Sequence, residues 1–232
     1  MNTLFPPSPA VFLPLVADPR CFPVRRIYCV GRNYAEHARE MGMPVDRASP
    51  IFFCKPADAL VLPGKHPRYP RATHELHHEV EWVLAIGKPI PAGSSTAELL
   101  DAVVGHAVGL DLTRRDLQAK AKQKGQPWDV AKAFDDSAPI SALTLCAGSL
   151  LPGQGRLWLE VNGEIRQQGD LADMLMPPSE ILAELSQLFD LMPGDLVFTG
   201  TPAGVAALQP GDHYRAGLND TVSLQGQILP AS

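Results

Sequence analysis

The sequence predicts a β-rich α+β fold in a chain of 232 residues. Many short apolar runs are separated by glycine, proline and asparagine turns, whereas only a few segments have helical spacing. Hydrophobic residues make up 45% of the chain, which is enough for one substantial core. We expect the proline-rich residues 1–24 to form an N-terminal arm or a short strand pair, and residues 25–232 to form a single main domain.

The elements follow from local patterns along the chain. Strands are predicted at residues 27–30, 51–53, 59–62, 79–86, 103–110 and from 195, with further short strands in 211–228. A hairpin is expected in 157–168, because Asn162-Gly163 favours a tight turn. Helices are predicted at about 34–41, 95–102, 113–124 and 179–189.

Capping patterns predict where two of these helices start. Asn33, with Glu36 three residues later, has the pattern of an N-cap and its capping-box partner, and Gly42 is a suitable stop. Thr113 and Asp116 are expected to open the later helix in the same way. Residues 43–78 are rich in prolines and turns, which suggests a cover over a site.

Charge and composition exclude several classes of partner. The net charge is -5 and the pI is about 5.8, so neither nucleic acid nor an anionic membrane is expected to bind. No stretch approaches eighteen apolar residues, and prolines interrupt an N-terminus that has no basic start, so neither a membrane span nor a signal peptide is predicted. The four cysteines are scattered, which argues against a zinc-thiolate site or disulfides and suits the reducing cytoplasm.

Two glutamates on the predicted strand 79–86 are the first candidates for chemistry. A spacing of two places Glu79 and Glu81 on one face, opposite the apolar residues between them. Two adjacent carboxylates repel, so one should be protonated unless a cation lies between them. The pattern alone leaves open a second reading, in which both glutamates lie on an outward, solvated face.

Asp111 ends the neighbouring predicted strand and adds a third carboxylate. Its same-face neighbours Gly105, Ala107 and Gly109 are small, so we expect room for a ligand beside it. Three carboxylates without thiolates favour a hard cation, Mg²⁺ or Mn²⁺.

The histidines suggest a base rather than a zinc site. His37 and Glu40 are three residues apart on a predicted helix, and an imidazole oriented by a carboxylate can activate water near neutral pH. A solvated surface pair is the alternative. His74, His77 and His78 lack an HExxH or helical spacing, so they are interpreted as loop residues or supports of the site.

Further polar residues suggest an anionic substrate. Arg115 and Gln118 share a helix face just after Asp111, where Arg115 could hold a substrate carboxylate, and Lys132 could stabilise an oxyanion. The alternative for both cations is simple surface exposure. The segment TGTPAGV at 199–205 lacks the spacing of a phosphate-binding loop, and neither GxSxG nor GxGxxG occurs, which disfavours serine hydrolases and dinucleotide enzymes.

Seven segments in order resemble the fumarylacetoacetate hydrolase family, most closely its short, single-domain branch of acylpyruvate hydrolases and oxaloacetate decarboxylases. They are VGRNYAEHAREMG, FFCKPADAL, LHHEVEW, GLDLTRRDLQ, GQPWDVAKAFDDSAPI, LWLEVNGEIRQQGD and PGDLVFTGTPAGV. Each is weakly informative alone, but their order is highly specific, and they span residue 25 to near the C-terminus.

The resemblance implies a mixed β-sheet roll with peripheral helices, a homodimer, and a catalytic role for residues 25–232. It implies that Glu79, Glu81 and Asp111 are the metal ligands and that His37 and Glu40 are the family's His-Glu dyad. The active-site lysine corresponds to Lys132 and the loop threonine to Thr201. Arg115 and Gln118 correspond to positions near the bound substrate.

The function that the resemblance implies is Mg²⁺- or Mn²⁺-dependent cleavage of the C–C bond of acylpyruvates. Such 2,4-dioxo acids, for example fumarylpyruvate or acetylpyruvate, would give pyruvate and a carboxylic acid. Alternatives are an oxaloacetate decarboxylase or keto–enol tautomerase, and an isomerase or decarboxylase of 2-oxo diacids from aromatic catabolism. These reactions share an enolate, so the sequence does not separate them. A non-catalytic module that binds oxo acids is a further alternative.

Overall fold

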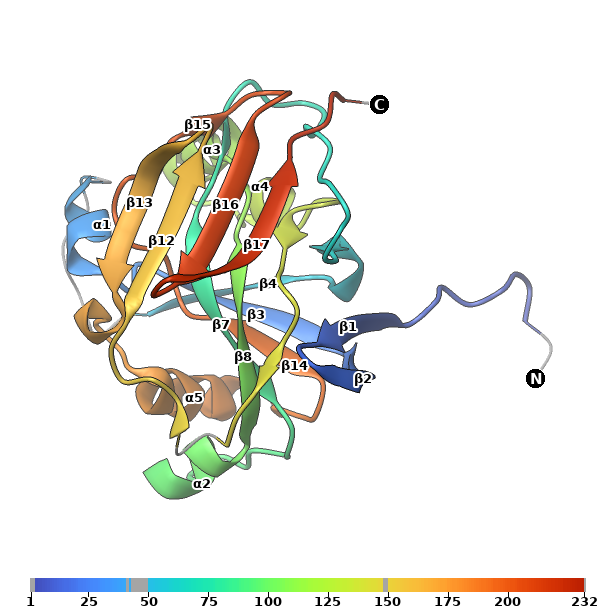
Figure 1. Ribbon diagram of the computed structural model, residues 1–232, viewed down its shortest axis with the longest axis vertical. Helices are drawn as coiled ribbons and strands as arrows, with labels where there is room; N and C mark the ends of the chain where they lie inside the picture. The colour runs from blue at the N-terminus through green and yellow to red at the C-terminus, as the bar shows by residue number, and fades with distance from the viewer. Residues whose placement is uncertain (1–2, 41, 43–49, 148–149, 232) are drawn as a thin grey trace.

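A mixed six-stranded sheet forms the centre of the molecule. The computed structural model describes residues 3–40, 42, 50–147 and 150–231 (Figure 1). The central sheet has the strand order β11-β8-β7-β14-β3-β4. Its strands are Thr144–Leu145 (β11), Val103–Leu110 (β8), Val80–Ile86 (β7), Asp195–Phe198 (β14), Arg26–Gly31 (β3) and Ile51–Lys55 (β4). The β14–β3 pair is parallel and the other pairs are antiparallel.

A four-stranded antiparallel sheet packs over one face of the central sheet, in the order β13-β12-β16-β17 (Figure 1). Its strands are Arg156–Val161 (β12), Glu164–Asp170 (β13), His213–Leu218 (β16) and Thr221–Gln227 (β17). The β12–β13 hairpin turns at Asn162-Gly163, both with positive φ, which confirms the predicted turn.

The larger hydrophobic core lies between these two sheets and is closed by two helices. Val80, Trp82 and Leu84 on β7 face Leu157 and Leu159 on β12 across it. Helices α2 and α5 lie together at one end (Figure 1). The helices are Ala35–Glu40 (α1), Thr96–Asp101 (α2), Arg115–Lys124 (α3), Asp129–Lys132 (α4) and Pro178–Leu188 (α5). The β-rich roll with peripheral helices that the sequence predicted is confirmed.

The opposite face of β7 is covered as well, by a smaller core that includes Val83 and Ala85. The hairpin of Val11–Leu15 (β1) and Asp18–Val24 (β2) contributes Leu13 and Phe22 to it. Residues 3–10 extend away from the body (Figure 1). The predicted N-terminal strand pair therefore exists, whereas a domain boundary at residue 24 stays a prediction.

The remaining elements are short. They are Ala57–Ala59 (η1), Leu60–Val61 (β5), Leu76–His77 (β6), Thr113–Arg114 (β9), Ala138–Pro139 (β10), Leu171–Asp173 (η3) and Ala207–Leu208 (β15). The cover expected over 43–78 falls partly on residues 43–49, which lie outside the described residues. Residues 50–78 contribute β4, β5 and β6 to three different sheets, so this part is framework rather than a loose cover. Among the described residues, no helix is long and apolar enough to cross a bilayer.

Both predicted N-caps were wrong, because the side chains of Asn33 and Thr113 bond elsewhere. The Asn33 amide donates to the carbonyls of Met176 and Thr199 at 3.0 and 2.8 Å, and its oxygen accepts from Met176 N. Thr113 Oγ1 donates to the carbonyl of Asp111, and α3 begins without a side-chain cap. Local spacing suggested caps, but these polar groups stabilise contacts between distant segments.

The small residues of β8 that precede Asp111 are packed rather than open toward a ligand. A Cβ on Gly109 would lie 2.6 Å from the Phe198 ring and 3.1 Å from Val83 Cγ2. Gly109 therefore admits the side chains of Phe198 and Val83, and a Cβ on Gly105 would lie 2.5 Å from the carbonyl oxygen of Thr144, so neither glycine leaves room for a ligand.

Gly109→Ala is expected to lower the free energy of unfolding of the metal-free protein by about 1–3 kcal/mol, because the added methyl overpacks a closed core. Urea unfolding measures the change. Gly153→Ala is the matched control, since a Cβ there meets nothing within 4 Å. Equal stability of the two variants would contradict this account of the small residues.

Candidate active site

Three carboxylates converge where β7 and β8 meet. Val80 pairs with Leu110, and Asp111 N donates to the carbonyl of Glu79 at 2.8 Å, so Asp111 lies opposite Glu79. Oxygens of Glu79, Glu81 and Asp111 all lie within 4.8 Å of one another. The exposed fractions of these residues are 5%, 1% and 0%. The alternative of an outward, solvated face is therefore wrong.

Two cations neutralise part of this cluster. Lys132 Nζ lies 2.7 Å from Glu79 Oε2 and 2.5 Å from Asp111 Oδ2, and the Arg115 guanidinium pairs with Glu79 Oε1. Burial alone would raise the pKa of Glu79, but Lys132 and Arg115 outweigh it and hold this pKa well below its usual range. Burial disfavours the charge of Lys132, yet Asp111 and Glu79 raise its pKa above the ordinary value. Neither Lys132 nor Arg115 is the exposed cation of the alternative interpretation.

Glu81 is the carboxylate of the cluster that forms no ion pair with the described residues. Its pKa is raised well above the usual range by burial first, and then by the negative charges of Asp111 and Glu79. Within the described residues its one hydrogen-bond donor is the Gly200 N–H, 2.7 Å from Oε2. Ionised Glu81 therefore needs positive charge that the described residues do not place in contact with it.

The donor set fits a divalent cation. Asp111 Oδ1 is buried and accepts no hydrogen bond from the described residues, although Lys55 Nζ lies 2.9 Å away. Three converging carboxylates offer only oxygen, which hard cations such as Mg²⁺ and Mn²⁺ prefer. Among the described residues this is the one cluster of histidine, cysteine and acidic side chains with such an arrangement. Glu79, Glu81 and Asp111 would hold the ion.

Lys55 supports the cluster from β4, and the sequence analysis missed it. Its ammonium group is fully buried, pairs with Asp111, and donates to the carbonyls of Leu112 and Lys132. It thereby fixes the backbone that presents Lys132. Only the packing of β4 against α4 brings these residues together, so no local pattern could indicate the contact.

His37 and Glu40 form a pair at the mouth of the cluster. His37 Nδ1 lies 3.3 Å from Glu40 Oε2, and the Gly204 N–H donates to both Glu40 oxygens at 3.0 and 3.2 Å. His37 is only 7% exposed, so the alternative of a solvated surface pair is wrong. Burial is the main cause of a lowered pKa for His37, which keeps the imidazole neutral near pH 7. Because a carboxylate can only accept, Nδ1 carries the proton and Nε2 is the free basic atom.

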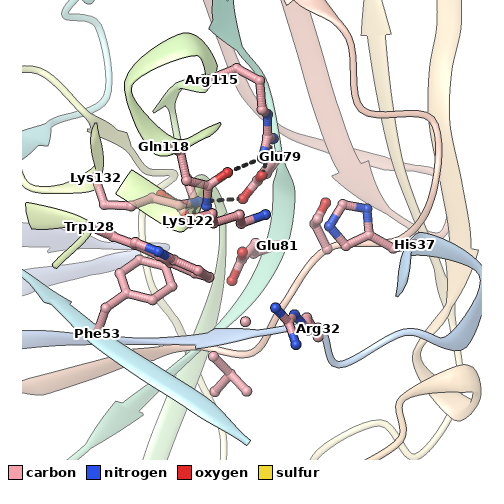
Figure 2. Close-up of a pocket in the computed structure, with 14 residues that line it drawn as sticks. Arg32, His37, Phe53, Glu79, Glu81, Arg115, Gln118, Lys122, Trp128 and Lys132 are labelled. Carbon is pink, nitrogen blue, oxygen red and sulfur yellow. Dashed lines mark hydrogen bonds and ion pairs between the residues drawn. The ribbon is translucent and has the colours of Figure 1, made fainter. Parts of the chain in front are cut away.

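One pocket contains every predicted site residue except Glu40, which lies behind His37. Figure 2 shows Lys132 and Trp128 on one side of it and His37 on the other, with Glu79 and Glu81 between them. The pocket is lined by Val30, Gly31, Arg32, His37, Phe53, Glu79, Glu81, Asp111, Arg115, Gln118, Lys122, Trp128, Lys132 and Thr201. Arg32, Phe53, Lys122 and Trp128 are the polar and aromatic members that the sequence analysis did not identify.

The predicted substrate contacts hold one another in place. Gln118 Oε1 accepts from Arg115 Nη1 at 2.6 Å, and Arg115 Nε lies 3.4 Å from His77 Nδ1. Thr201 Oγ1 accepts from Gln167 at 2.8 Å. Arg115 is thus pre-oriented in the pocket wall, while its contact with a substrate carboxylate stays a prediction.

Gln167, from β13, ties this wall together and was also missed. Its oxygen accepts from Val80 N and faces His78 Nδ1, and its amide donates to Thr201 Oγ1 and the carbonyl of Pro202. His78 is therefore a buried support. Gln167 lies in an alternating strand beside exposed neighbours, where nothing in the sequence distinguishes it.

Gln167→Leu is expected to lower the free energy of unfolding by about 3 kcal/mol, because Val80 N–H and the Pro202 carbonyl lose buried partners at about 1–3 kcal/mol each. Chemical denaturation measures this. Gln168→Leu is the matched control, since Gln168 is its exposed neighbour on the same strand. A loss below about 1 kcal/mol would show that the network contributes little to stability.

Comparisons with known proteins agree with this geometry. Residues 26–229 match the family model described as fumarylacetoacetate (FAA) hydrolase C-terminal. Oxaloacetate tautomerase YcgM of Escherichia coli is 43% identical over 211 residues, covering 90% of this chain and 92% of the relative. The human mitochondrial oxaloacetate tautomerase FAHD1 is 40% identical over 204 residues, with 88% and 91% covered.

A solved structure is similar over nearly the whole chain. It is the fumarylpyruvate hydrolase of Pseudomonas aeruginosa in complex with Mn²⁺ and pyruvate. The TM-score is 0.92 at 43% identity, and the alignment covers 99% of this chain and 100% of the other. The matched segments include both the central sheet and the acidic cluster, and on this evidence the chain belongs to the fumarylacetoacetate hydrolase family.

Proposed function

We propose that this protein is a divalent-metal-dependent hydrolase that cleaves acylpyruvates, such as fumarylpyruvate, to pyruvate and a carboxylic acid. The observation that carries the proposal is a neutral, buried His37 that lines the same pocket as the Glu79–Glu81–Asp111 cluster. The similarity to a fumarylpyruvate hydrolase with Mn²⁺ and pyruvate supports it.

The acidic end of the pocket is the binding site for the 2-oxo acid. A bound Mg²⁺ or Mn²⁺ would act there as a Lewis acid toward the carboxylate and 2-oxo oxygens of the substrate. Arg115 is held by Gln118, and its remaining guanidinium N–H groups donate to the substrate carboxylate. Thr201 lines the same pocket. Lys132 places its ammonium charge where enolate charge develops as pyruvate leaves.

His37 supplies the base for hydrolysis. Its Nε2 takes a proton from water, and the hydroxide formed attacks the C4 carbonyl carbon of the acylpyruvate. The C3–C4 bond then breaks, its electron pair stays on C3 of the pyruvate enolate, and the acyl group leaves as a carboxylic acid. The proton on Nε2 returns to C3. Glu40 keeps the imidazole in this tautomer through Nδ1.

A second candidate is keto–enol tautomerisation or decarboxylation of oxaloacetate, which the similarity to two oxaloacetate tautomerases favours. Tautomerisation needs only proton transfer at C3 and oxygen, so His37 would suffice without an attacking water. Isomerisation of a longer 2-oxo diacid is a third possibility, since a 5-carboxymethyl-2-hydroxymuconate delta-isomerase of Mycobacterium smegmatis matches at 29% identity with a TM-score of 0.78.

One screen separates these reactions. Fumarylpyruvate, acetylpyruvate and oxaloacetate are incubated with the enzyme and Mg²⁺ or Mn²⁺, while pyruvate, CO₂ and the enol absorbance are read separately. Pyruvate formed from acylpyruvates without CO₂ is the expected result. Enol absorbance that changes for oxaloacetate alone would replace hydrolysis with tautomerisation as the function, and no turnover of any substrate would favour a binding module.

We further propose that residues 25–232 form the catalytic domain and that Mg²⁺ is the ion used in catalysis. We also propose that the protein is a homodimer and is located in the cytoplasm. Four free cysteines support a reducing compartment. Exposed Phe12 and Val16 on the β1–β2 hairpin support a contact between subunits. Light scattering that gives the mass of a single chain would contradict the dimer.

A further inference from the structure

Two cations in the pocket have no anionic partner. Arg32 and Lys122 both line it, from the loop before α1 and from the last turn of α3. Neither makes an ion pair or side-chain hydrogen bond with the described residues. Lys122 instead lies over the ring of Trp128, with Nζ 5.2 Å from the centroid. Figure 2 shows both side chains extending into the same space beside Glu81 and His37.

The other cations of the pocket differ in this respect. Lys132 and Arg115 form ion pairs with Glu79. Asp111 forms ion pairs with both Lys132 and Lys55. Glu79 and Asp111 are therefore already paired with cations from the protein, and in the proposed function the remaining carboxylate, Glu81, is paired with the metal ion. Arg32 and Lys122 remain as charge that the protein does not use, inside a pocket that receives an anionic substrate.

The backbone and the neighbouring side chains hold these two groups in place. Arg32 has φ +64°, a left-handed backbone conformation that residues other than glycine rarely adopt. It is fixed by the adjacent Asn33, whose amide bonds to two distant segments. Burial, followed by the charges of Arg115 and Arg32, lowers the pKa of Lys122 to about 8, so these cations lie close enough to oppose one another. Strained, unpaired and mutually repelling charges at a pocket are typical of a ligand-binding role.

We propose that Arg32 and Lys122 bind a second carboxylate at the far end of the substrate, which makes the enzyme selective for dicarboxylic 2-oxo acids. The inference rests on the proposed function, in which the first carboxylate and the 2-oxo group are held at the acidic cluster. A substrate whose acyl group ends in a carboxylate, as in fumarylpyruvate, places that group beyond C4. A methyl terminus, as in acetylpyruvate, leaves both cations unpaired.

Turnover of both substrates by Arg32→Gln, Lys122→Gln and the double variant tests the assignment. Each single substitution is expected to lower kcat/KM for fumarylpyruvate about 10- to 100-fold, as for loss of a charged hydrogen bond, and to change kcat/KM for acetylpyruvate less than about threefold. Lys124→Gln, an exposed lysine on the same helix, is the control and should change neither value. Equal losses for both substrates would overturn the proposal, because the cations would then serve catalysis or folding.

A binding measurement keeps the inference testable even if hydrolysis is not the reaction. Calorimetry with Mn²⁺ compares 2-oxoheptanedioate with 2-oxoheptanoate, which share a chain length and differ only in the terminal carboxylate. The diacid is expected to bind the wild-type protein about 10-fold or more tightly, and the double variant is expected to lose this preference. Equal affinities for the wild type would refute the second-carboxylate site, whereas a diacid preference without acylpyruvate turnover would refute only the proposed hydrolysis.

Discussion

Replacement of Glu81 by alanine is expected to abolish binding of Mg²⁺ and Mn²⁺, with a loss of activity of the same extent. Glu81 is 1% exposed and is the member of the acidic cluster that forms no ion pair with the described residues. Without it, two carboxylates remain, and both already pair with lysine. Titration calorimetry with Mn²⁺ measures the effect, with the exposed Glu184→Ala as control. Stoichiometric Mn²⁺ binding by the alanine variant would remove the basis of the proposed metal site.

Glu81→Gln adds a pH test of the same residue. In the metal-free protein the pKa of Glu81 is well above its usual range, so the protonated form is the one compatible with folding. Stability from this group is complete below the unfolded pKa of about 4.3 and is lost as pH rises through the higher folded pKa. Metal-free wild type should therefore lose stability relative to Glu81→Gln as pH rises above about 4.3.

Two measurements check this linkage. Thermal unfolding of both metal-free proteins across pH gives the stability difference, and parallel curves would contradict the pKa assignment. Calorimetry of Mn²⁺ in buffers of different ionisation enthalpy should reveal proton release by the wild type, because binding requires the ionised carboxylate.

Glu40→Gln is expected to lower kcat for acylpyruvate hydrolysis by about 10²–10⁴-fold while Mn²⁺ affinity stays unchanged. The amide keeps the shape of the side chain but removes the charge that orients His37 through Nδ1. Glu40 does not line the metal cluster, so calorimetry should separate the two effects. Glu36→Gln, an exposed change on the same helix, should leave kcat unaltered.

The pH profile of Glu40→Gln gives a further check. The hydrogen bond to Glu40 raises the pKa of His37 against a larger lowering by burial. Loss of the carboxylate should therefore shift the acid limb of kcat/KM to lower pH. An unshifted limb, or a parallel loss of Mn²⁺ binding, would show that Glu40 does not act through His37.

The sequence was most informative where function follows from strand alternation. Glu79 and Glu81 interrupt an otherwise apolar strand, and Asp111 ends the next one, so their convergence followed from pairing β7 with β8. The resemblance then located His37 and Lys132. Alternation with a period of two is a local property that can be read from the sequence. That both faces of β7 are buried follows from the two cores that cover them.

Contacts between distant segments could not be predicted in the same way. Asn33 has the spacing of a cap, but the two carbonyls that it binds are 143 and 166 residues away along the chain. Lys55 serves the site through Lys132 on α4, and Gln167 serves it through Val80 on the central sheet. Gly105 and Gly109 of β8 suggested an opening, but Thr144 and Phe198 pack against them. In each case the function of the residue depends on a contact with a residue that is distant in the sequence.

The loop that follows β14 touches both halves of the reaction machinery, since Gly200 N–H bonds to Glu81 and Gly204 N–H bonds to Glu40. A single short backbone segment thereby sets the spacing between the ion-binding carboxylates and the base. The two side chains proposed to bind the outer carboxylate, Arg32 and Lys122, come instead from the loop before α1 and from α3. In the proposed function, substitutions at Arg32 or Lys122 would therefore change which acyl group is accepted while the contacts of this loop with Glu81 and Glu40 stay as they are.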